Sequence, residues 1–210
     1  MRTRIKICGL RDPAHARLAA AEGADAIGLV FHPASPRFVA VEEAARVVVE
    51  LPPFVMAVGL FVDTPEAEIR AVLARVRLDL LQFHGDETPA ECERYGVPYL
   101  RAVRMEEGVD LVEYAHRFSR AKALLLDAHV PGVPGGTGQR FDWGRIPREL
   151  PIPFVLSGGL DPENVSQAIR ETRPWAVDVS SGVESQRGMK DPAKITAFIR
   201  SVQREDVRPA

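Results

Sequence analysis

The sequence predicts an α/β protein, a single (β/α)8 TIM barrel of minimal length. Short β-branched and apolar segments alternate with Ala-, Arg- and Glu-rich amphipathic segments, eight of each kind, and no low-complexity or Gly/Ser-rich linker divides the chain. The length agrees, because eight average strands and helices use about 128 residues and short connections add about 70. The 210 residues therefore hold one barrel with short loops.

The elements follow from this alternation. The expected strands are Arg4–Cys8, Ala26–Phe31, Phe54–Val62, Leu78–Phe83, Tyr99–Val103, Ala123–Asp127, Phe154–Leu156 and Ala176–Val179. The expected helices are Pro13–Glu22, Val41–Glu50, Pro65–Val76, Pro89–Tyr95, Val109–Phe118, Trp143–Arg148, Pro162–Glu171 and Pro192–Gln203. Five helix starts place an N-cap residue before a proline, which favours the first helical position; they are Asp12-Pro13, Thr64-Pro65, Thr88-Pro89, Asp161-Pro162 and Asp191-Pro192.

One catalytic domain is expected over residues 1–203, followed by a frayed tail over residues 204–210. A doubly wound open sheet is the alternative architecture. It needs fewer strands than the sequence predicts, and it usually carries a phosphate loop after the first strand, where this chain has only CGLRDP. The barrel is therefore favoured.

Charge and composition exclude several classes of protein. The 27 Lys+Arg and 29 Asp+Glu residues give a net charge of −2, which argues against a nucleic-acid binder and a polybasic membrane-surface protein. The longest uncharged apolar stretch, residues 51–62, is shorter than the about 20 residues of a membrane span and contains two prolines. The N-terminus does not resemble a signal peptide, and Cys8 and Cys92 are too few for a disulfide framework. We expect a cytoplasmic enzyme or small-molecule binder.

Polar residues at the carboxyl ends of the strands mark the expected active site, because barrel enzymes place it there. Residues two apart on a strand share a face, so Lys6 lies on the face of Cys8, and Asp178 lies on the face of Ser180. Closing the barrel makes the first and last strands neighbours. We therefore expect Lys6 and Asp178 to pair beneath the site, where the charge of Lys6 would favour the thiolate of Cys8.

Two clusters of small residues end the last two strands, Ser157-Gly158-Gly159 and Ser180-Ser181-Gly182. Glycine lets backbone N–H groups approach a ligand, and a following helix start favours an anion. Barrels commonly bind phosphate at this place. The glycine-rich segment over residues 131–143 could supply further donors or act as a lid. The pattern predicts a phosphorylated small molecule as the ligand.

Cys8 and Asp127 are the candidate base and acid. A thiolate can take a proton from carbon while a carboxylic acid protonates a departing oxygen, and this combination suits an isomerisation. No nucleotide loop, HExxH, CxxC or Rossmann fingerprint is present, so we expect no cofactor and no metal.

Eight motifs occur in order along the chain: KICGLR (6–11), SPR (35–37), GLFVD (59–63), QFHGDE (82–87), LLLDA (124–128), GGTGQRFDW (135–143), SGGLDPENV (157–165) and DVSSGVES (178–185) with GMKD (188–191). Together they resemble the phosphoribosylanthranilate isomerase family of tryptophan biosynthesis. The resemblance implies a TIM barrel that catalyses an Amadori rearrangement. The substrate would be N-(5′-phosphoribosyl)anthranilate and the product 1-(o-carboxyphenylamino)-1-deoxyribulose 5-phosphate.

The resemblance also implies a role for each matching residue. Cys8 would take the proton from ribose C2′, and Asp127 would protonate the ring oxygen. Arg37 would lie near the anthranilate carboxylate, where a guanidinium fork fits, and Gln82 and His84 would line the pocket. Backbone and hydroxyl groups would hold the phosphate; they belong to Gly136, Gly138, Gly158, Gly159, Ser180, Ser181 and Gly182.

Two other functions stay open at this point. A related isomerase barrel of histidine synthesis would carry an aspartate where this chain has Cys8. A non-catalytic barrel would bind a phosphorylated ligand without turnover, and the intact acid and base argue against it. Association into a homodimer would add stability to a minimal barrel, although the sequence carries no interface signature.

Overall fold

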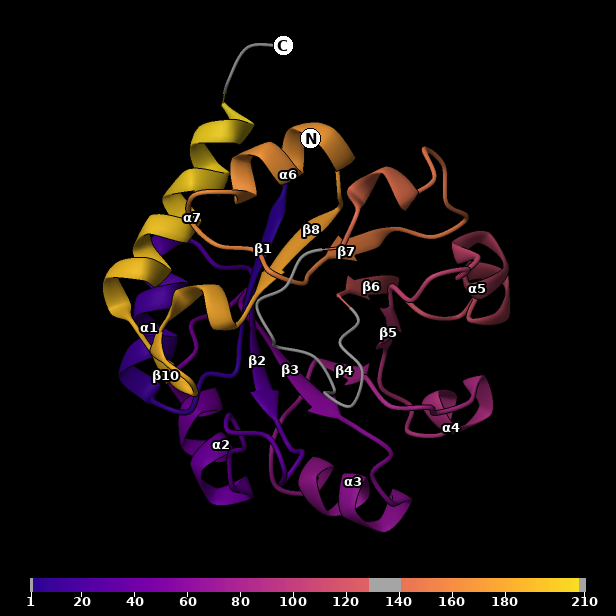
Figure 1. Cartoon of the computed structure of the whole chain (residues 1–210). Helices are drawn as coiled ribbons and strands as arrows, with labels where there is room; N and C mark the ends of the chain where they lie inside the picture. Colours follow the sequence, from indigo (N-terminus) through magenta and orange to yellow (C-terminus); the bar gives the residue numbers. More distant parts are fainter. Residues whose placement is uncertain (1, 129–140, 208–210) are drawn as a thin grey trace.

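The computed structural model describes residues 2–128 and 141–207 and confirms the predicted barrel (Figure 1). Eight parallel strands close in sequence order, because β1 pairs with both β2 and β8. The strands are β1 (Arg4–Cys8), β2 (Ala26–Val30), β3 (Met56–Phe61), β4 (Leu80–Phe83), β5 (Tyr99–Arg104), β6 (Ala123–Asp127), β7 (Phe154–Leu156) and β8 (Ala176–Val179).

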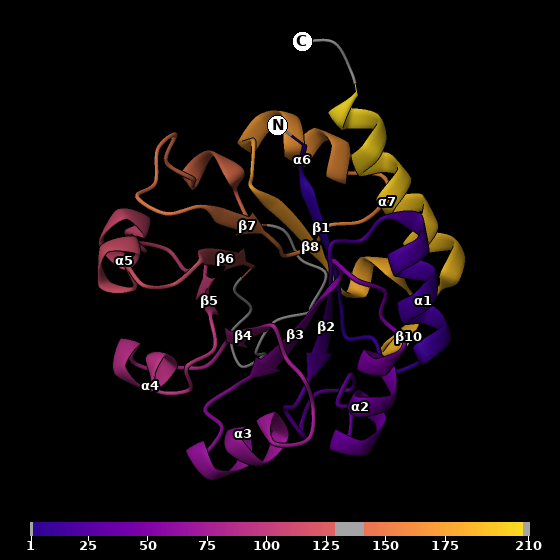
Figure 2. The same cartoon turned by 180° about the vertical axis from the view of Figure 1, so that it is seen from behind.

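Helices surround the strands, as the opposite views of Figures 1 and 2 show. In the described part of the chain they are α1 (Pro13–Glu22), α2 (Val41–Val49), α3 (Glu66–Leu73), α4 (Pro89–Glu93), α5 (Leu111–Arg117), α6 (Val165–Thr172) and α7 (Pro192–Asp206). Two short 3-10 turns, η1 (Trp143–Arg145) and η2 (Ser181–Val183), and a small hairpin of β9 (Glu184–Gln186) and β10 (Met189–Lys190) complete the described elements.

Side chains alternate between the barrel interior and the layer under the helices. A small apolar cluster fills the interior and includes Leu80 of β4 and Leu125 of β6, whereas Leu81 and Leu124 belong to the large outer core. Side chains two residues apart on a strand share a face. Gln82 and Asp127 therefore also point inward, one layer nearer the carboxyl ends of the strands. The strand pattern thus aims polar groups at one end of the barrel.

Several predicted helix boundaries are confirmed by their caps. Asp12 accepts a hydrogen bond from the N–H of Ala14, and Asp191 caps α7 in the same way. Thr88 and Glu91 form a reciprocal capping box at the start of α4. Gly23 ends α1 with a φ of 113°, which a residue with a side chain adopts only at a cost.

The sixth predicted helix, Trp143–Arg148, is wrong. Only the three-residue turn η1 forms there, and Ile146 is extended with φ −80° and ψ 120°. The following Pro147 explains this, because a proline ring disfavours the helical conformation of the residue before it.

The predicted start of the next helix at Pro162 is also wrong, since α6 begins at Val165. Asp161 caps a turn instead of a helix: its Oδ1 accepts from the N–H groups of Glu163 and Asn164. Asn164 in turn donates to the carbonyl of Gly159 at 2.8 Å. These bonds fasten the turn to the end of β7 and leave fewer residues for the helix.

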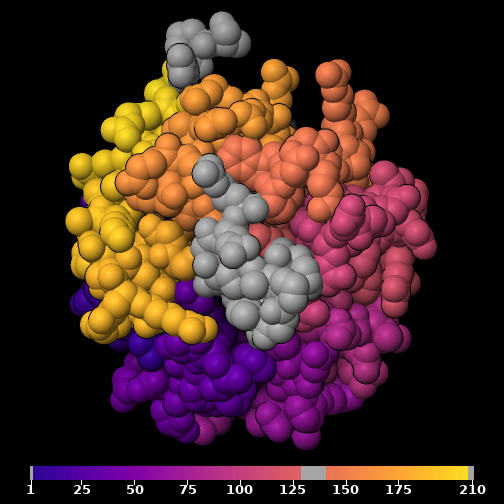
Figure 3. Space-filling model, in the orientation of Figure 1, coloured from indigo at the N-terminus to yellow at the C-terminus, as the bar shows by residue number. Residues whose placement is uncertain are grey.

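The last helix is longer than the predicted Pro192–Gln203, because α7 continues to Asp206. The Asp206 carboxylate accepts hydrogen bonds from the backbone N–H and the hydroxyl of Thr3 at 2.9 to 3.0 Å. In Figure 3 the yellow segments near the C-terminus lie beside the indigo segments near the N-terminus. Gln203 of α7 also donates to the carbonyl of Glu22 at the end of α1. The last helix thus fastens the first β/α unit to the last; residues 208–210 lie outside the described residues.

Candidate active site

One pocket at the carboxyl ends of the strands collects most of the predicted site residues. Gly182 lies just beyond it, with its Cα packed against the carbonyl of Leu160, and Gly136 and Gly138 lie outside the described residues. The predicted residues that line the pocket are Cys8, Arg37, Gln82, His84, Asp127, Gly158, Gly159, Ser180 and Ser181.

Cys8 ends β1 and is buried above an ion pair. Lys6 Nζ lies 2.8 Å from Asp178 Oδ1, and both side chains are about 5% exposed, so the predicted pairing across β1 and β8 is confirmed. Gly28 of β2 makes room for this arrangement. A Cβ at that position would lie 2.7 Å from Cys8 Sγ and 3.1 Å from Lys6 Nζ.

The expected bias of Cys8 toward the thiolate is corrected by the structure. Burial raises the pKa of the Cys8 thiol, and the opposing charges of Lys6 and Lys190 do not cancel this effect. Burial also pushes the pKa of Lys6 down, but Asp178 and Cys8 outweigh burial and leave it above its ordinary value. The lysine is therefore a cation beneath a thiol whose pKa lies above its ordinary value.

Asp127 ends β6 and faces the pocket from the side opposite β2. Its Oδ2 lies 3.2 Å from His84 Nε2, and its Oδ1 accepts from the N–H of Ala128 at 3.0 Å. His84 Nδ1 lies 3.0 Å from Gln82 Nε2. All three side chains are buried, so Gln82, His84 and Asp127 form one continuous polar chain along the pocket wall.

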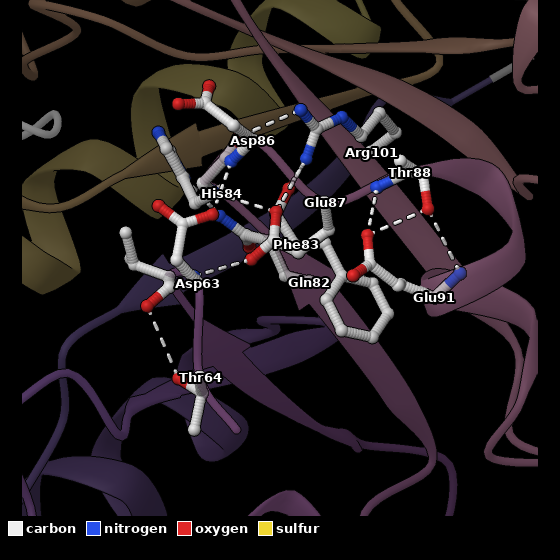
Figure 4. A network of polar contacts seen from close by, with 12 residues as sticks. Asp63, Thr64, Gln82, Phe83, His84, Asp86, Glu87, Thr88, Glu91 and Arg101 are labelled. Carbon is white, nitrogen blue, oxygen red and sulfur yellow. Dashed lines mark hydrogen bonds and ion pairs between the residues drawn. The ribbon is translucent and has the colours of Figure 1, made fainter. Parts of the chain in front are cut away.

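The loop after β4 is held by a buried ion pair, shown in Figure 4. Arg101 donates to Glu87 and to the carbonyl of Gly85, each at 2.7 Å. Glu87 also accepts from the N–H groups of Gly85 and Asp63 at 2.9 and 2.8 Å. Asp63, for which the sequence predicted no role, therefore fastens the loop after β3 to the loop that follows His84.

Arg37 is buried against a glutamate. Its Nε and Nη2 atoms donate to the two carboxylate oxygens of Glu184 at 2.7 and 2.9 Å, a bidentate geometry. Lys190 donates to the same carboxylate at 2.8 Å. Burial alone would raise the pKa of Glu184, but Arg37, Lys190 and the N–H of Gly188 outweigh it and lower the pKa to about 2.

Each of the two small-residue clusters packs closely against a neighbouring loop. Gly158 and Gly159 have φ values of 80° and 65°, and a Cβ on Gly158 would lie 2.5 Å from the N atom of Ala128. A Cβ on Gly182 would lie 1.9 Å from the carbonyl oxygen of Leu160. Ser180 donates from its hydroxyl to the carbonyl of Cys8 at 3.1 Å. Glycine is therefore required for this close approach of the loops after β6, β7 and β8.

Sequence reasoning missed the roles of Glu184 and Lys190. Both lie inside quoted motifs, but they meet only because β9 and β10 form a hairpin after β8. Strands of two or three residues have no readable periodicity. The buried Lys190 also donates to the carbonyl of Ser180 at 2.9 Å, so the hairpin supports the site from the side of β8.

Within residues 2–128 and 141–207, no group of three or more His, Cys, Asp or Glu side chains is arranged to hold a metal ion. None of the described helices is both long and apolar enough to cross a membrane.

Comparison with known proteins agrees with this geometry. The family model described as N-(5′-phosphoribosyl)anthranilate (PRA) isomerase matches residues 5–201. The N-(5′-phosphoribosyl)anthranilate isomerase of Nitrosococcus oceani is 54% identical over 202 residues, which cover 96% of this chain and 98% of the relative. That of Azotobacter vinelandii is 53% identical over 200 residues and covers 95% and 97%.

Solved structures show the same relationship. The phosphoribosyl anthranilate isomerase of Thermotoga maritima superposes with a TM-score of 0.87 at 40% identity and covers 96% of this chain and 98% of its own. A phosphoribosyl anthranilate isomerase in complex with reduced 1-(o-carboxyphenylamino)-1-deoxyribulose 5-phosphate gives a TM-score of 0.84 at 39% identity with the same coverage. This chain therefore belongs to the N-(5′-phosphoribosyl)anthranilate isomerase family.

Proposed function

We propose that this chain converts N-(5′-phosphoribosyl)anthranilate into 1-(o-carboxyphenylamino)-1-deoxyribulose 5-phosphate. The observation that carries the proposal is that Cys8 of β1 and Asp127 of β6 line one pocket together with the glycines that follow β7. A base, an acid and a place for a phosphate are the parts that an Amadori rearrangement of a phosphorylated sugar needs. The relatives named above carry this activity in their names, which supports the proposal.

In the proposed reaction Asp127 donates a proton to the ribose ring oxygen. The bond from that oxygen to C1′ breaks, its electron pair stays on oxygen, and the nitrogen lone pair forms a C1′=N double bond. Cys8, as the thiolate, then takes the proton from C2′, and the released electron pair yields an enolamine. This enolamine tautomerises to the 2-ketone product.

The remaining residues orient the substrate in this proposal. Arg37 binds the anthranilate carboxylate, and the bidentate contact with Glu184 holds its guanidinium in place. The backbone near Gly158, Gly159, Ser181 and Gly182 binds the phosphate, and we keep Gly136, Gly138 and Ser180 as further members of this proposed site. The tight approach of the glycine clusters supports a compact anion site.

The direct test is fluorescence-monitored conversion of freshly generated phosphoribosylanthranilate by the purified chain. We expect turnover by the wild type and a loss of about 100- to 10,000-fold in kcat for Cys8→Ala and Asp127→Asn, with little change in folding. The ribotide substrate of the related histidine-pathway isomerase, assayed in parallel, should not be converted. Tight binding without turnover would instead identify a non-catalytic barrel.

We also propose that the chain works in the cytoplasm, because a charged sugar phosphate stays in the compartment of the enzymes that make it. We further propose that it forms a homodimer. A related enzyme of Thermotoga maritima is described as dimeric. In this chain the loop between α2 and β3 presents apolar side chains to solvent, with Phe54 fully exposed and Val49 and Met56 exposed beside it. Light scattering should give twice the mass of the chain, and Phe54→Ser should shift the assembly to monomers.

A further inference from the structure

The polar chain on the pocket wall runs from β4 to β6 and ends on the proposed acid. Gln82 contacts Nδ1 of His84 at 3.0 Å, and Nε2 of the same ring contacts Asp127 Oδ2 at 3.2 Å. Gln82 of β4 and His84, which directly follows β4, both line the pocket and are buried. The inference below rests on the proposed function, because it concerns how Asp127 holds its proton.

The orientation of the Gln82 amide determines the protonation of the imidazole. With the amide nitrogen of Gln82 facing Nδ1, Nδ1 is the acceptor and the ring proton belongs on Nε2. Nε2 then donates to Oδ2 of Asp127, and this arrangement matches the carboxylate form of that residue. A proton carried on Oδ2 itself is not matched by it.

The other atom of the same amide has no partner. Gln82 Oε1 is buried and makes no hydrogen bond with any described residue. A half-turn of the amide about its last bond exchanges Oε1 and Nε2. The oxygen then faces Nδ1 and can only accept, so the ring proton moves to Nδ1, and Nε2 becomes an acceptor for the O–H of protonated Asp127. Each orientation pairs one amide atom with Nδ1, so the amide can match either tautomer of the ring.

The backbone of His84 is anchored on both sides. The N–H of His84 donates to the carbonyl of Phe61 at 2.9 Å. The carbonyl of His84 accepts from Arg104 of β5 at 3.2 Å. The loop that follows is held by the buried pair of Arg101 and Glu87, seen in Figure 4. The amide of Gln82 is therefore the part of the chain that can turn.

We propose that Gln82 is a positioning residue that pairs with either tautomer of His84, so that the imidazole accepts from Asp127 when Asp127 carries its proton and donates to it afterwards. When Asp127 passes its proton to the ring oxygen, it is left as a carboxylate beside a neutral imidazole protonated on Nδ1. The imidazole then loses the Nδ1 proton to solvent and gains one from solvent at Nε2, so the ring stays neutral. The amide turns with this exchange.

The test uses the full-length protein labelled with 15N-histidine, because nitrogen chemical shifts distinguish the two tautomers. The signals of His84 are identified by their loss in His84→Asn. We expect the substrate-free wild type to carry the proton on Nε2. Gln82→Glu keeps the size of the side chain, but its carboxylate can only accept, so we expect the proton on Nδ1. Gln82→Met should remove the preference, and Gln167→Glu, on the exposed face of α6, should leave the His84 signals unchanged.

Turnover measurements separate this role from a contact with substrate. We expect kcat to fall about 10-fold in Gln82→Glu and Gln82→Met, a part of the full effect of a general acid, with KM changed less than kcat. Circular dichroism and thermal unfolding identify any variant that has not folded. Unchanged His84 signals in folded Gln82→Glu would overturn the inference, and a change confined to KM would assign Gln82 Oε1 to the substrate instead. A wild type that shows the expected tautomers but no turnover would overturn the proposed function alone.

Discussion

Two buried lysines lie close to the thiol of Cys8. Lys6 pairs with Asp178, and Lys190 pairs with Glu184, each at 2.8 Å. Both charges oppose the effect of burial on Cys8, yet the pKa of the thiol stays above its ordinary value. The thiolate of Cys8 is therefore weakly populated at neutral pH, but it is a strong base once it has formed.

The pH dependence of turnover should reflect this balance. In the proposed reaction Cys8 acts as the thiolate, so kcat/KM should rise with pH and still be rising at the ordinary thiol pKa of about 8.5. Cys8→Asp should move the rising limb to lower pH, since a carboxyl group ionises near pH 4 when unperturbed. Steady-state rates from pH 6 to 10 test this, and a wild-type profile that is level from pH 7 upward would contradict it.

Gly28 should tolerate no side chain. The methyl group of Gly28→Ala would lie 2.7 Å from Cys8 Sγ and 3.1 Å from Lys6 Nζ, so both must move. We expect a stability loss of about 1–3 kcal/mol from overpacking and a fall in kcat of at least about 10-fold from the displaced thiol. Urea unfolding and steady-state kinetics measure the two effects. Gly144→Ala, at an exposed position of η1, is the matched control and should change neither.

Single contacts and one proline, rather than periodicity, decide where α6 and α7 begin or end and why η1 is so short. The periodic pattern predicted the existence of α6 and α7, but the turn at Asp161 delays the start of α6, and the contact of Asp206 with Thr3 extends α7. Pro147 converts a predicted helix into the turn η1. Whether a helix forms depends on many residues, whereas the position of its end depends on one or two contacts.

The contact between the ends of the barrel should therefore be measurable. Asp206→Ala removes the acceptor of two groups on Thr3. We expect a loss of about 1–2 kcal/mol, or roughly 3–6 °C in Tm, with kcat unchanged because the pocket lies at the other end of the strands. Thermal unfolding followed by circular dichroism tests this, with the exposed Glu107→Ala as control. An equal Tm for both variants would show that α7 does not stabilise the N-terminal strand in this way.

For the whole molecule, buried ion pairs join parts of the chain that are far apart in sequence. Lys6 and Asp178 are 172 residues apart, and Arg37 and Glu184 are 147 apart. Each pair connects an early β/α unit to the last one, so charge pairing as well as strand pairing closes the ring. Loss of one partner would leave an uncompensated buried charge.

Stability in acid should report on Glu184. Its pKa is about 2 in the folded protein, against an ordinary value of 4.5, so its ionised form contributes roughly 3 kcal/mol at neutral pH. This contribution is present above about pH 4.5 and is lost as the pH falls toward 2. Urea unfolding between pH 6 and 3 should show the wild type losing stability faster than Glu184→Gln. Parallel curves for the two proteins would contradict the assignment.

The barrel, its eight strands and the positions of Cys8 and Asp127 at strand ends could be predicted from the amino-acid sequence. It also predicted the pair of Lys6 and Asp178, because strand alternation and barrel closure are regular geometry that a local pattern can encode. Arg37 came from the family resemblance and not from any periodic pattern. These features repeat along the chain or follow from the order of its elements.

The groups that surround the candidate site follow from how the barrel is packed. The contact of His84 with Asp127, the hairpin that brings Glu184 to Lys190, and the direction of the Cys8 pKa each depend on groups from more than one element. Burial and charge are sums over neighbours in space, and a short sequence pattern does not encode which groups become neighbours. For this reason the barrel can be predicted from local sequence patterns, whereas the proton chemistry of the site depends on how the side chains pack in the folded protein.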